Sequence, residues 1–142
     1  MDVAVVVDAS VWVSRFISWD VNQSASHVWI ERYATAGGLL IAPAFFLVEV
    51  AAAISRRTGD PSLARGVIKD IYYFSAMRIL SLDSVLVWSA VEMAVDLHLR
   101  AGDTTYVALA RRLNIPLVSW DKEQLQRPGN LITTYTPSTY TF

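Results

Sequence analysis

The sequence of 142 residues contains no cysteine and only two histidines. Without cysteine the chain has no disulfide framework, no thiolate zinc site and no cysteine nucleophile. Two histidines leave little scope for a metal site built from imidazole groups. Carboxylates are therefore the side chains left to hold a metal ion. The absence of cysteine also fits a cytoplasmic protein, because disulfides persist in oxidising compartments.

Charged residues are scarce as well. They make up 18% of the chain, against 54% hydrophobic residues, and the formal net charge is −1. A chain with so much apolar surface to bury is expected to fold rather than remain disordered. A net charge near zero argues against a broad basic surface for nucleic acid. Most of the basic residues are arginine, the side chain that suits bidentate contacts to phosphate.

Long hydrophobic runs are missing too. The longest apolar stretch without charge covers residues 33–48, and Gly37, Gly38 and Pro43 interrupt it. It is shorter than the about 20 residues that a membrane-spanning helix needs. The N-terminal segment MDVAVVVD has no basic region before its apolar run, unlike a signal peptide. We therefore expect no membrane contact and a cytoplasmic location.

Apolar runs that alternate with helical patterns indicate an α/β fold. Residues 3–7 form a nearly unbroken β-branched run, which is typical of a strand buried on both faces. Further strands are expected at residues 39–42, 77–82, 116–120 and 131–134. Start and stop signals predict helices over residues 10–19, 24–36, 43–57, 61–76, 83–100 and 103–113. The pattern predicts a single domain over residues 1–142, with a central parallel sheet of four to five strands and helices on both faces.

Two acidic residues follow strands at the edge where such sheets form their sites. Asp8 comes directly after the first strand and Asp121 directly after the fourth, and ligands bind beyond the carboxyl ends of parallel strands. Each residue also has a purely structural interpretation. Asp8 can turn the chain into the next helix, and Asp121 with Gln124 matches a capping box.

Two further acids stand out on predicted helices. Glu49 lies in the segment PAFFLVEVAAAIS, which is apolar on nearly every side and has no Lys or Arg three or four residues away. A lone carboxylate in such a helix is costly unless it is paired, protonated or bound to a cation. A Glu at the edge of the helix can also reach solvent. Asp103 opens a helix, where it serves either as an N-cap or as a ligand.

The four acids together are more specific than any one of them. Carboxylates brought close together repel one another, and a hard cation makes such a cluster stable at neutral pH. A set of oxygen ligands without cysteine or histidine selects Mg²⁺ or Mn²⁺. Such an ion acidifies water and stabilises charge on a phosphate in transit. The cluster therefore predicts phosphate chemistry.

Three blocks of the sequence, VVDASVWVSRF, APAFFLVEVAAAISRR and LRAGDTTYVALARRLNIPLVSWDKEQL, resemble the PIN-domain ribonucleases. The resemblance is closest to the VapC-type toxins of prokaryotic toxin–antitoxin pairs, and it covers most of the chain in order and spacing. It implies a PIN-like domain that cleaves RNA with Mg²⁺ or Mn²⁺, and a cognate antitoxin that blocks the site. The four acids of the family fall on Asp8, Glu49, Asp103 and Asp121, and its hydroxyl falls on Ser10.

Two positions depart from the pattern of the family. Thr104 stands where many members have alanine, and Trp120 precedes the fourth acid where smaller residues are common. Neither change removes a ligand, but Trp120 is bulky enough to narrow the mouth of the site. On the helix before Asp103, Glu92 and Asp96 form a polar stripe, interpreted either as a solvated face or as outer acids of the site. Asp96 can also pair with an arginine four residues on.

Residues for substrate and partner follow from the same reasoning. Arg15, Arg56 and Arg111 are candidates for phosphate contacts, although Arg56 also suits a helix C-terminus.

Trp12, Phe16 and Trp19 fall at helical spacing, which is usual for core packing. Three large aromatic side chains on so short a segment are more than one helix usually buries in a core. The resemblance also implies an antitoxin that packs into a groove near these helices. The three residues are therefore also candidates for a partner surface. The surplus of apolar residues and the resemblance favour a homodimer, or a hetero-oligomer with the antitoxin.

Two other functions stay open on the residues alone. An Asp after the first strand also serves phosphoryl-acceptor proteins, but phosphatases of that kind usually carry a second Asp where this chain has Ser10. A catalytically inactive PIN-like module that binds RNA or acts as a scaffold would keep the acids as helix caps. A nucleotide-binding site is excluded, because neither G-x-G-x-x-G nor a Walker loop is present.

Overall fold

Five parallel strands form one sheet in the computed structural model, which describes residues 1–142. The strand order is β3-β2-β1-β4-β5. The strands are β1 (Ala4–Val7), β2 (Leu39–Pro43), β3 (Met77–Leu80), β4 (Leu117–Val118) and β5 (Thr134–Tyr135). The predicted α/β fold with a parallel sheet is confirmed, and β1 lies at its centre.

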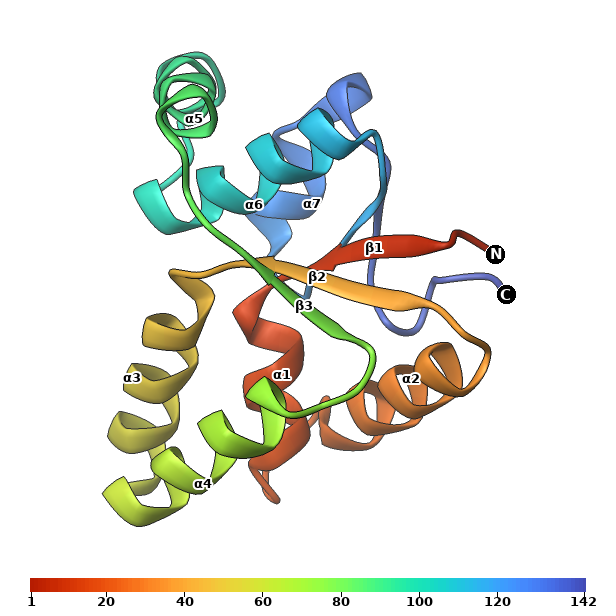
Figure 1. Cartoon of the computed structure of the whole chain (residues 1–142), viewed down its shortest axis with the longest axis vertical. Coiled ribbons are helices and arrows are strands. Elements are labelled where there is room, and N and C mark those ends of the chain that lie inside the picture. The colour runs from red at the N-terminus through yellow and green to blue at the C-terminus, as the bar shows by residue number, and fades with distance from the viewer.

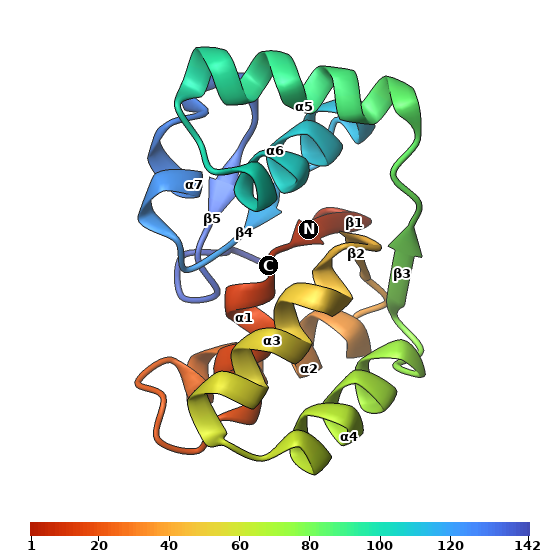
Figure 2. The same cartoon turned by 90° about the vertical axis from the view of Figure 1, so that its left-hand side faces the viewer.

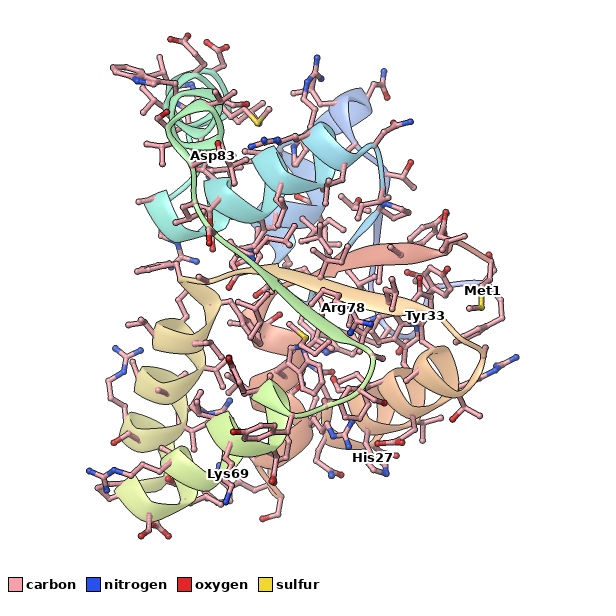
Figure 3. All side chains as sticks on the ribbon, viewed as in Figure 1. Met1, His27, Tyr33, Lys69, Arg78 and Asp83 are labelled. Atoms are coloured by element: carbon pink, nitrogen blue, oxygen red, sulfur yellow. The ribbon has the colours of Figure 1, made fainter.

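Helices cover both faces of this sheet, as predicted (Figure 1, Figure 2). They are α1 (Ala9–Phe16), α2 (Gln23–Thr35), α3 (Phe46–Thr58), α4 (Pro61–Tyr72), α5 (Ser84–Leu97), α6 (Ala101–Leu113) and α7 (Lys122–Gln126). The first four lie on one face and the last three on the other. In Figure 3, His27 and Lys69 mark the first layer, and Asp83 marks the start of α5 in the second.

The core lies where the central strand is enclosed between the two helical layers. Val5, Val6 and Val7 of β1 have no exposed surface. A strand covered on both faces needs apolar side chains in both directions, which explains its unbroken β-branched run. Because β1 is buried and central, the residue that follows it is carried to the middle of the carboxyl edge of the sheet.

Several element boundaries differ from the sequence prediction. Asp8, and not Ser10, caps α1 by accepting a hydrogen bond from the Ser10 amide. Pro43 ends β2 instead of opening a helix, because the hydrogen-bond ladder continues with the Ala44 amide, which donates to Leu80 O. The helix α3 therefore begins only at Phe46.

The helix α5 ends three residues earlier than predicted. His98 follows it with a left-handed backbone conformation, at φ 54°. The chain therefore turns before Arg100, which becomes the N-cap residue of α6. This turn carries Arg100 away from the polar stripe of α5 and toward the carboxyl edge of the sheet.

The C-terminal tail packs against α2. A 3₁₀ helix covers Gly129–Leu131, and β5 lies at Thr134–Tyr135, slightly later than the predicted strand. Tyr140 is buried beside Trp29 and Tyr33, with ring centroids 5.8 and 5.5 Å away. None of the helices is long and apolar enough to span a membrane.

Candidate active site

A cleft of about 510 Å³ opens at the carboxyl edge of the sheet, between α1, α3 and the N-terminal ends of α6 and α7. Five side chains that the sequence predicted as catalytic line it together: Asp8, Ser10, Glu49, Asp103 and Asp121. Residues so distant in the chain meet because the carboxyl ends of neighbouring parallel strands share one edge.

Asp8 is the most enclosed of these carboxylates, with 4% of its surface exposed. Its Oδ1 accepts a hydrogen bond from the Ser10 amide at 2.7 Å, and its Oδ2 accepts from the Ser10 hydroxyl at 2.8 Å. The Ser119 hydroxyl, which the sequence did not single out, also donates to Oδ2. Burial outweighs these hydrogen bonds and raises the pKa of Asp8 to about 6.

Glu49 reaches the cleft from the first turn of α3. The buried Tyr106 hydroxyl donates to Glu49 Oε1 at 2.7 Å. Burial, with the neighbouring charges of Asp8 and Asp103, raises the pKa of Glu49 above its usual value. A β-carbon at Gly102 would lie 3.1 Å from Glu49 Oε2, so glycine lets the start of α6 approach this carboxylate closely.

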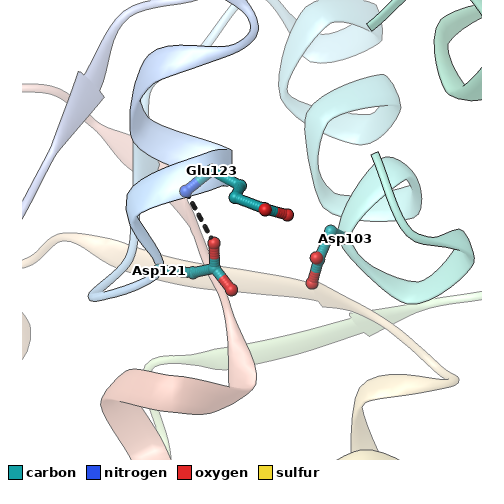
Figure 4. A group of neighbouring side chains, drawn as sticks. All are labelled: Asp103, Asp121 and Glu123. Atoms are coloured by element: carbon teal, nitrogen blue, oxygen red, sulfur yellow. Dashed lines mark hydrogen bonds between the residues drawn. The ribbon is translucent and has the colours of Figure 1, made fainter. Parts of the chain in front are cut away.

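Asp103, Asp121 and Glu123 form the tightest acidic group. One carboxylate oxygen from each lies within 4.8 Å of the others (Figure 4). Asp121 also caps α7 as predicted, with its Oδ1 accepting from the Glu123 amide at 2.8 Å and the Gln124 amide at 3.2 Å. Burial and the charge of Asp121 raise the pKa of Asp103. The sequence did not predict Glu123 as a site residue, because it is one of several charged or polar residues in the segment DKEQLQR, where such residues usually face solvent.

Arg100 bridges two of these acids. Its Nε donates to Asp103 Oδ2 at 3.1 Å and its Nη2 to Asp121 Oδ2 at 3.0 Å. The predicted pairing with Asp96 at i, i+4 is wrong, since α5 ends before Arg100. Asp96 and Glu92 are exposed and do not line the cleft.

Gln124 takes a different role from the one the capping box predicted. Its Nε2 donates to Asp103 Oδ1 at 2.9 Å, while the Asp121 amide donates to Ser119 Oγ instead. Gln124 is 1% exposed, and its Oε1 has no hydrogen-bond partner. The cleft therefore contains one buried, unpaired oxygen beside its carboxylates.

Trp120 does not narrow the mouth of the cleft as expected. Its indole Nε1 donates to Ser26 Oγ on α2 at 2.8 Å, and its amide donates to Ser10 Oγ at 3.0 Å. The side chain therefore anchors the loop between β4 and α7, and it does not line the cleft. Thr104 is buried, with its hydroxyl donating to Arg100 O at 2.8 Å.

A hard divalent cation fits this donor set. The set is made of carboxylate oxygens together with the unpaired Gln124 Oε1, which Mg²⁺ and Mn²⁺ accept as ligands. Desolvation, with repulsion between the acids as a smaller cause, raises the pKa of Asp8, Glu49 and Asp103, and a bound cation would stabilise their charged forms. Arg100 contacts only Asp103 and Asp121, so Asp8 and Glu49 have no cation of their own.

The three arginines predicted for phosphate contact are separated by the fold. Arg56 lines the cleft, with Arg57 beside it. Arg15 folds back onto Glu31 at 2.5 Å and packs on the ring of Trp12. Arg111 lies at the far end of α6, beside a different pocket. Of the three predicted arginines, only Arg56 therefore lines the cleft with the acids, and Arg15 and Arg111 do not.

The three aromatic residues predicted for a partner are also separated. Trp12 is 1% exposed and packs in the core against Phe46 and Phe74, so no partner can reach it. Phe16 is only partly buried, and Trp19, beyond the end of α1, is 63% exposed. The core interpretation is correct for Trp12, while Phe16 and Trp19 stay candidates for a partner surface.

The fold and the cleft define a class: a parallel α/β domain with a carboxylate cluster at the carboxyl edge of its sheet. The PIN domain family matches residues 5–130, and the chain belongs to this family. No curated protein sequence matches the chain.

Solved structures share this fold at low sequence identity. VapC20 of Mycobacterium tuberculosis, a toxin that cleaves the sarcin–ricin loop, is 19% identical, with TM-score 0.71 over 84% of this chain and 92% of that one. VapBC2 of Rickettsia felis, bound to a promoter DNA fragment, is 12% identical, with TM-score 0.72 over 94% and 98%. A toxin–antitoxin complex from Klebsiella pneumoniae is 12% identical, with TM-score 0.67 over 97% and 99%.

Proposed function

We propose that this PIN-domain protein is a metal-dependent endoribonuclease and the toxin of a type II toxin–antitoxin pair. The observation that carries the proposal is the convergence of Asp8, Glu49, Asp103 and Asp121 in one cleft. The pKa values of Asp8, Glu49 and Asp103 are raised, and Asp121 lies beside Asp103. Carboxylates gathered in this way are unfavourable without a cation. The likeness to a sarcin–ricin loop cleaving toxin supports RNA as the substrate.

The four acids would hold one or two Mg²⁺ or Mn²⁺ ions, with Glu123 as a further ligand in reach of Asp103 and Asp121. When bound, such an ion neutralises the acids and stabilises the charge that develops on a phosphate during hydrolysis. Ser10 orients Asp8 through two hydrogen bonds, and so serves the site without contacting the ion.

Basic residues stand on both sides of the acids. Arg56 and Arg57 lie on the α3 wall of the cleft. Arg100, Lys122 and Arg127 lie around an adjoining depression on the α7 side. An RNA backbone that crosses the acids would meet guanidinium or ammonium groups before and after the scissile phosphate, which supports single-stranded binding across the cleft.

An antitoxin and a second copy of the chain are the proposed protein partners. The toxin–antitoxin complex with this fold supports the antitoxin, and the exposed Trp19 with the half-buried Phe16 offers it an aromatic surface. Such a toxin would act in the cytoplasm, where its RNA substrates are.

A homodimer is supported by an apolar stripe on the outer face of α5. Val85, Trp88, Val91 and Val95 are 69, 68, 40 and 67% exposed, beside the exposed Glu92 and Asp96 of the same helix. Such a stripe can pair with the same stripe on a second copy through a twofold axis. The homodimer is therefore proposed to form through α5, away from the cleft.

The test is RNA cleavage by protein purified free of any partner. Cleavage is expected with Mg²⁺ or Mn²⁺, none with a chelator, and at least about a hundredfold less in Asp8→Asn. Arg112→Gln is the folded control and should cleave like the wild type, because it changes an exposed residue near the C-terminal end of α6 that pairs with Asp83 at the start of α5.

Cleavage that survives in Asp8→Asn would contradict the assignment of the site. RNA binding without cleavage in the wild type, together with no stabilisation by Mn²⁺, would instead establish the inactive binding module.

A further inference from the structure

Arg100 occupies the oxygens that a metal ion in this cleft would need. The Oδ1 atoms of Asp103 and Asp121 already accept hydrogen bonds within the protein, from the Gln124 side chain and from the amides of Glu123 and Gln124 respectively. The two Oδ2 atoms are the ones that Arg100 takes, at 3.1 and 3.0 Å. An ion that binds both acids from the open side of the cleft meets the guanidinium first.

The Arg100 side chain is held by charge and not by packing. It is 73% exposed, and its only partners are the two carboxylates. The backbone, by contrast, is anchored, because Arg100 O accepts from both the amide and the hydroxyl of Thr104. An exposed ion pair contributes little stability, so the guanidinium can leave while its Cα stays at the start of α6.

A released guanidinium would remain inside the site. Arg100 lines both the acidic cleft and the adjoining depression that contains His98, Lys122 and Arg127. Anchored at the boundary between the two, it can reach an anion on either side. The guanidinium fork is suited to phosphate oxygens as well as to carboxylates.

We propose that Arg100 is an exchangeable counter-ion, which holds Asp103 and Asp121 when no metal ion is bound and moves to a phosphate of the substrate when a divalent ion takes their oxygens. The proposal deepens the proposed function and rests on it, since the phosphate is that of an RNA diester. It assigns Arg100 two successive partners in one site.

This exchange couples the two ligands. A metal ion that displaces Arg100 frees it for a phosphate, and a phosphate that draws Arg100 away vacates the oxygens for the metal. Each ligand must then tighten the binding of the other by the same factor. Without the guanidinium at this position, the coupling through it disappears.

The experiment measures Mn²⁺ affinity from the free-ion EPR signal, with and without saturating dimethyl phosphate at matched ionic strength. The proteins are the wild type, Arg100→Gln, and Arg112→Gln as a control that removes the same charge from the far end of α6. Arg100→Gln is expected to bind Mn²⁺ alone roughly 3- to 30-fold more tightly than the wild type, because two exposed ion pairs no longer compete. Dimethyl phosphate should tighten Mn²⁺ binding in the wild type and the control, and not in Arg100→Gln.

Arg100→Lys is the second variant, because it keeps the charge but cannot bridge two carboxylates as a fork. Its Mn²⁺ affinity is expected between those of the wild type and Arg100→Gln.

Each other outcome has a distinct meaning. Equal or weaker Mn²⁺ binding by Arg100→Gln overturns the exchange, and so does a phosphate effect that persists in this variant. If the wild type still binds Mn²⁺ and cleaves RNA in those cases, the proposed function stands. If neither the wild type nor Arg100→Gln binds Mn²⁺, the proposed function and the exchange both fail.

Discussion

Asp8 shows how a single residue can be both a structural cap and a member of the acidic cluster in the cleft. Its carboxylate begins α1 through the Ser10 amide, and it also points into the cleft. The two interpretations that the sequence left open are therefore not alternatives. Burial holds the Asp8 carboxylate in place, but it also makes its negative charge unfavourable unless hydrogen-bond donors or a cation stabilise that charge.

The raised pKa of Asp8 predicts that the metal-free protein loses stability as the pH rises. Between about pH 4 and pH 6 the folded protein keeps the Asp8 proton that the unfolded chain has released, since the pKa moves from 3.8 to about 6 on folding. The free energy of unfolding should fall through this window by roughly 3 kcal/mol. Glu49 and Asp103 act in the same direction.

Urea unfolding in chelator across pH 4 to 8 measures this effect. Asp8→Asn should flatten the pH dependence, and Mn²⁺ should restore stability at neutral pH more than at pH 5. An identical slope in the wild type and Asp8→Asn would show that folding does not raise the pKa of Asp8.

Tyr106 is expected to orient Glu49. Tyr106→Phe removes the hydrogen bond from a buried hydroxyl to the half-buried Glu49 carboxylate and should lower stability by about 1–3 kcal/mol, with at least about tenfold less RNA cleavage from the misplaced acid. Thermal melting and a cleavage assay measure the two effects.

Tyr33→Phe is the matched control, since Tyr33 is equally buried and donates to Asp2 O far from the cleft. It should lose stability and keep its cleavage rate. Full activity in Tyr106→Phe would show that Glu49 needs no orienting donor.

At the scale of the elements, α2 supports the site without contributing a residue to the cleft. Ser26 of α2 accepts from the Trp120 indole and is hydrogen-bonded to Ser14 of α1 at 2.7 Å. Trp120 directly precedes Asp121. Because the Trp120 side chain is bonded to α2, the position of α2 helps to fix where Asp121 lies.

Ser26→Ala should therefore destabilise the protein by about 1–3 kcal/mol, because it removes a buried hydroxyl that accepts from the Trp120 indole N–H and leaves that N–H without its acceptor. It should also weaken Mn²⁺ binding through Asp121. Ser24→Ala, at an exposed position of the same helix, should do neither. Melting temperatures and Mn²⁺ titrations compare the two, and unchanged values for Ser26→Ala would mean that Trp120 has another acceptor.

At the scale of the whole molecule, the net charge of −1 hides a separation of charges. Acids gather in the cleft, while arginines and Lys122 stand around it. Apolar surface is also unevenly distributed, since α5 exposes Trp88 and its valine neighbours although Leu86, Ala90 and Met93 of the same helix are buried.

Trp88→Asp is expected to convert a dimer into a folded monomer, because it places a charge at the centre of the proposed α5 interface. Light scattering after size-exclusion chromatography measures the mass, and circular dichroism measures the fold. Trp19→Asp should keep the dimer and lose antitoxin binding instead. A wild-type protein that is monomeric at all concentrations would contradict the dimer.

Local patterns in the sequence predicted what depends on neighbours in the chain. The β-branched run before Asp8, the lone acid of the apolar α3, Asp103 at the opening of a helix and the cap at Asp121 were sufficient to locate the sheet, its carboxyl edge and four acids of the cleft. Their order along a parallel sheet carries them to one edge, so their meeting followed from topology alone.

Only the tertiary structure decided which side chains complete the site. Arg100 pairs with Asp103 and Asp121 instead of Asp96 because a left-handed residue at His98 ends α5 early. Trp12 belongs to the core, and Arg15 and Arg111 do not line the cleft, because each helix is placed by packing against the sheet. Periodicity fixes which face of a helix a residue occupies, whereas the contacts of that face depend on long-range packing, which no local pattern encodes.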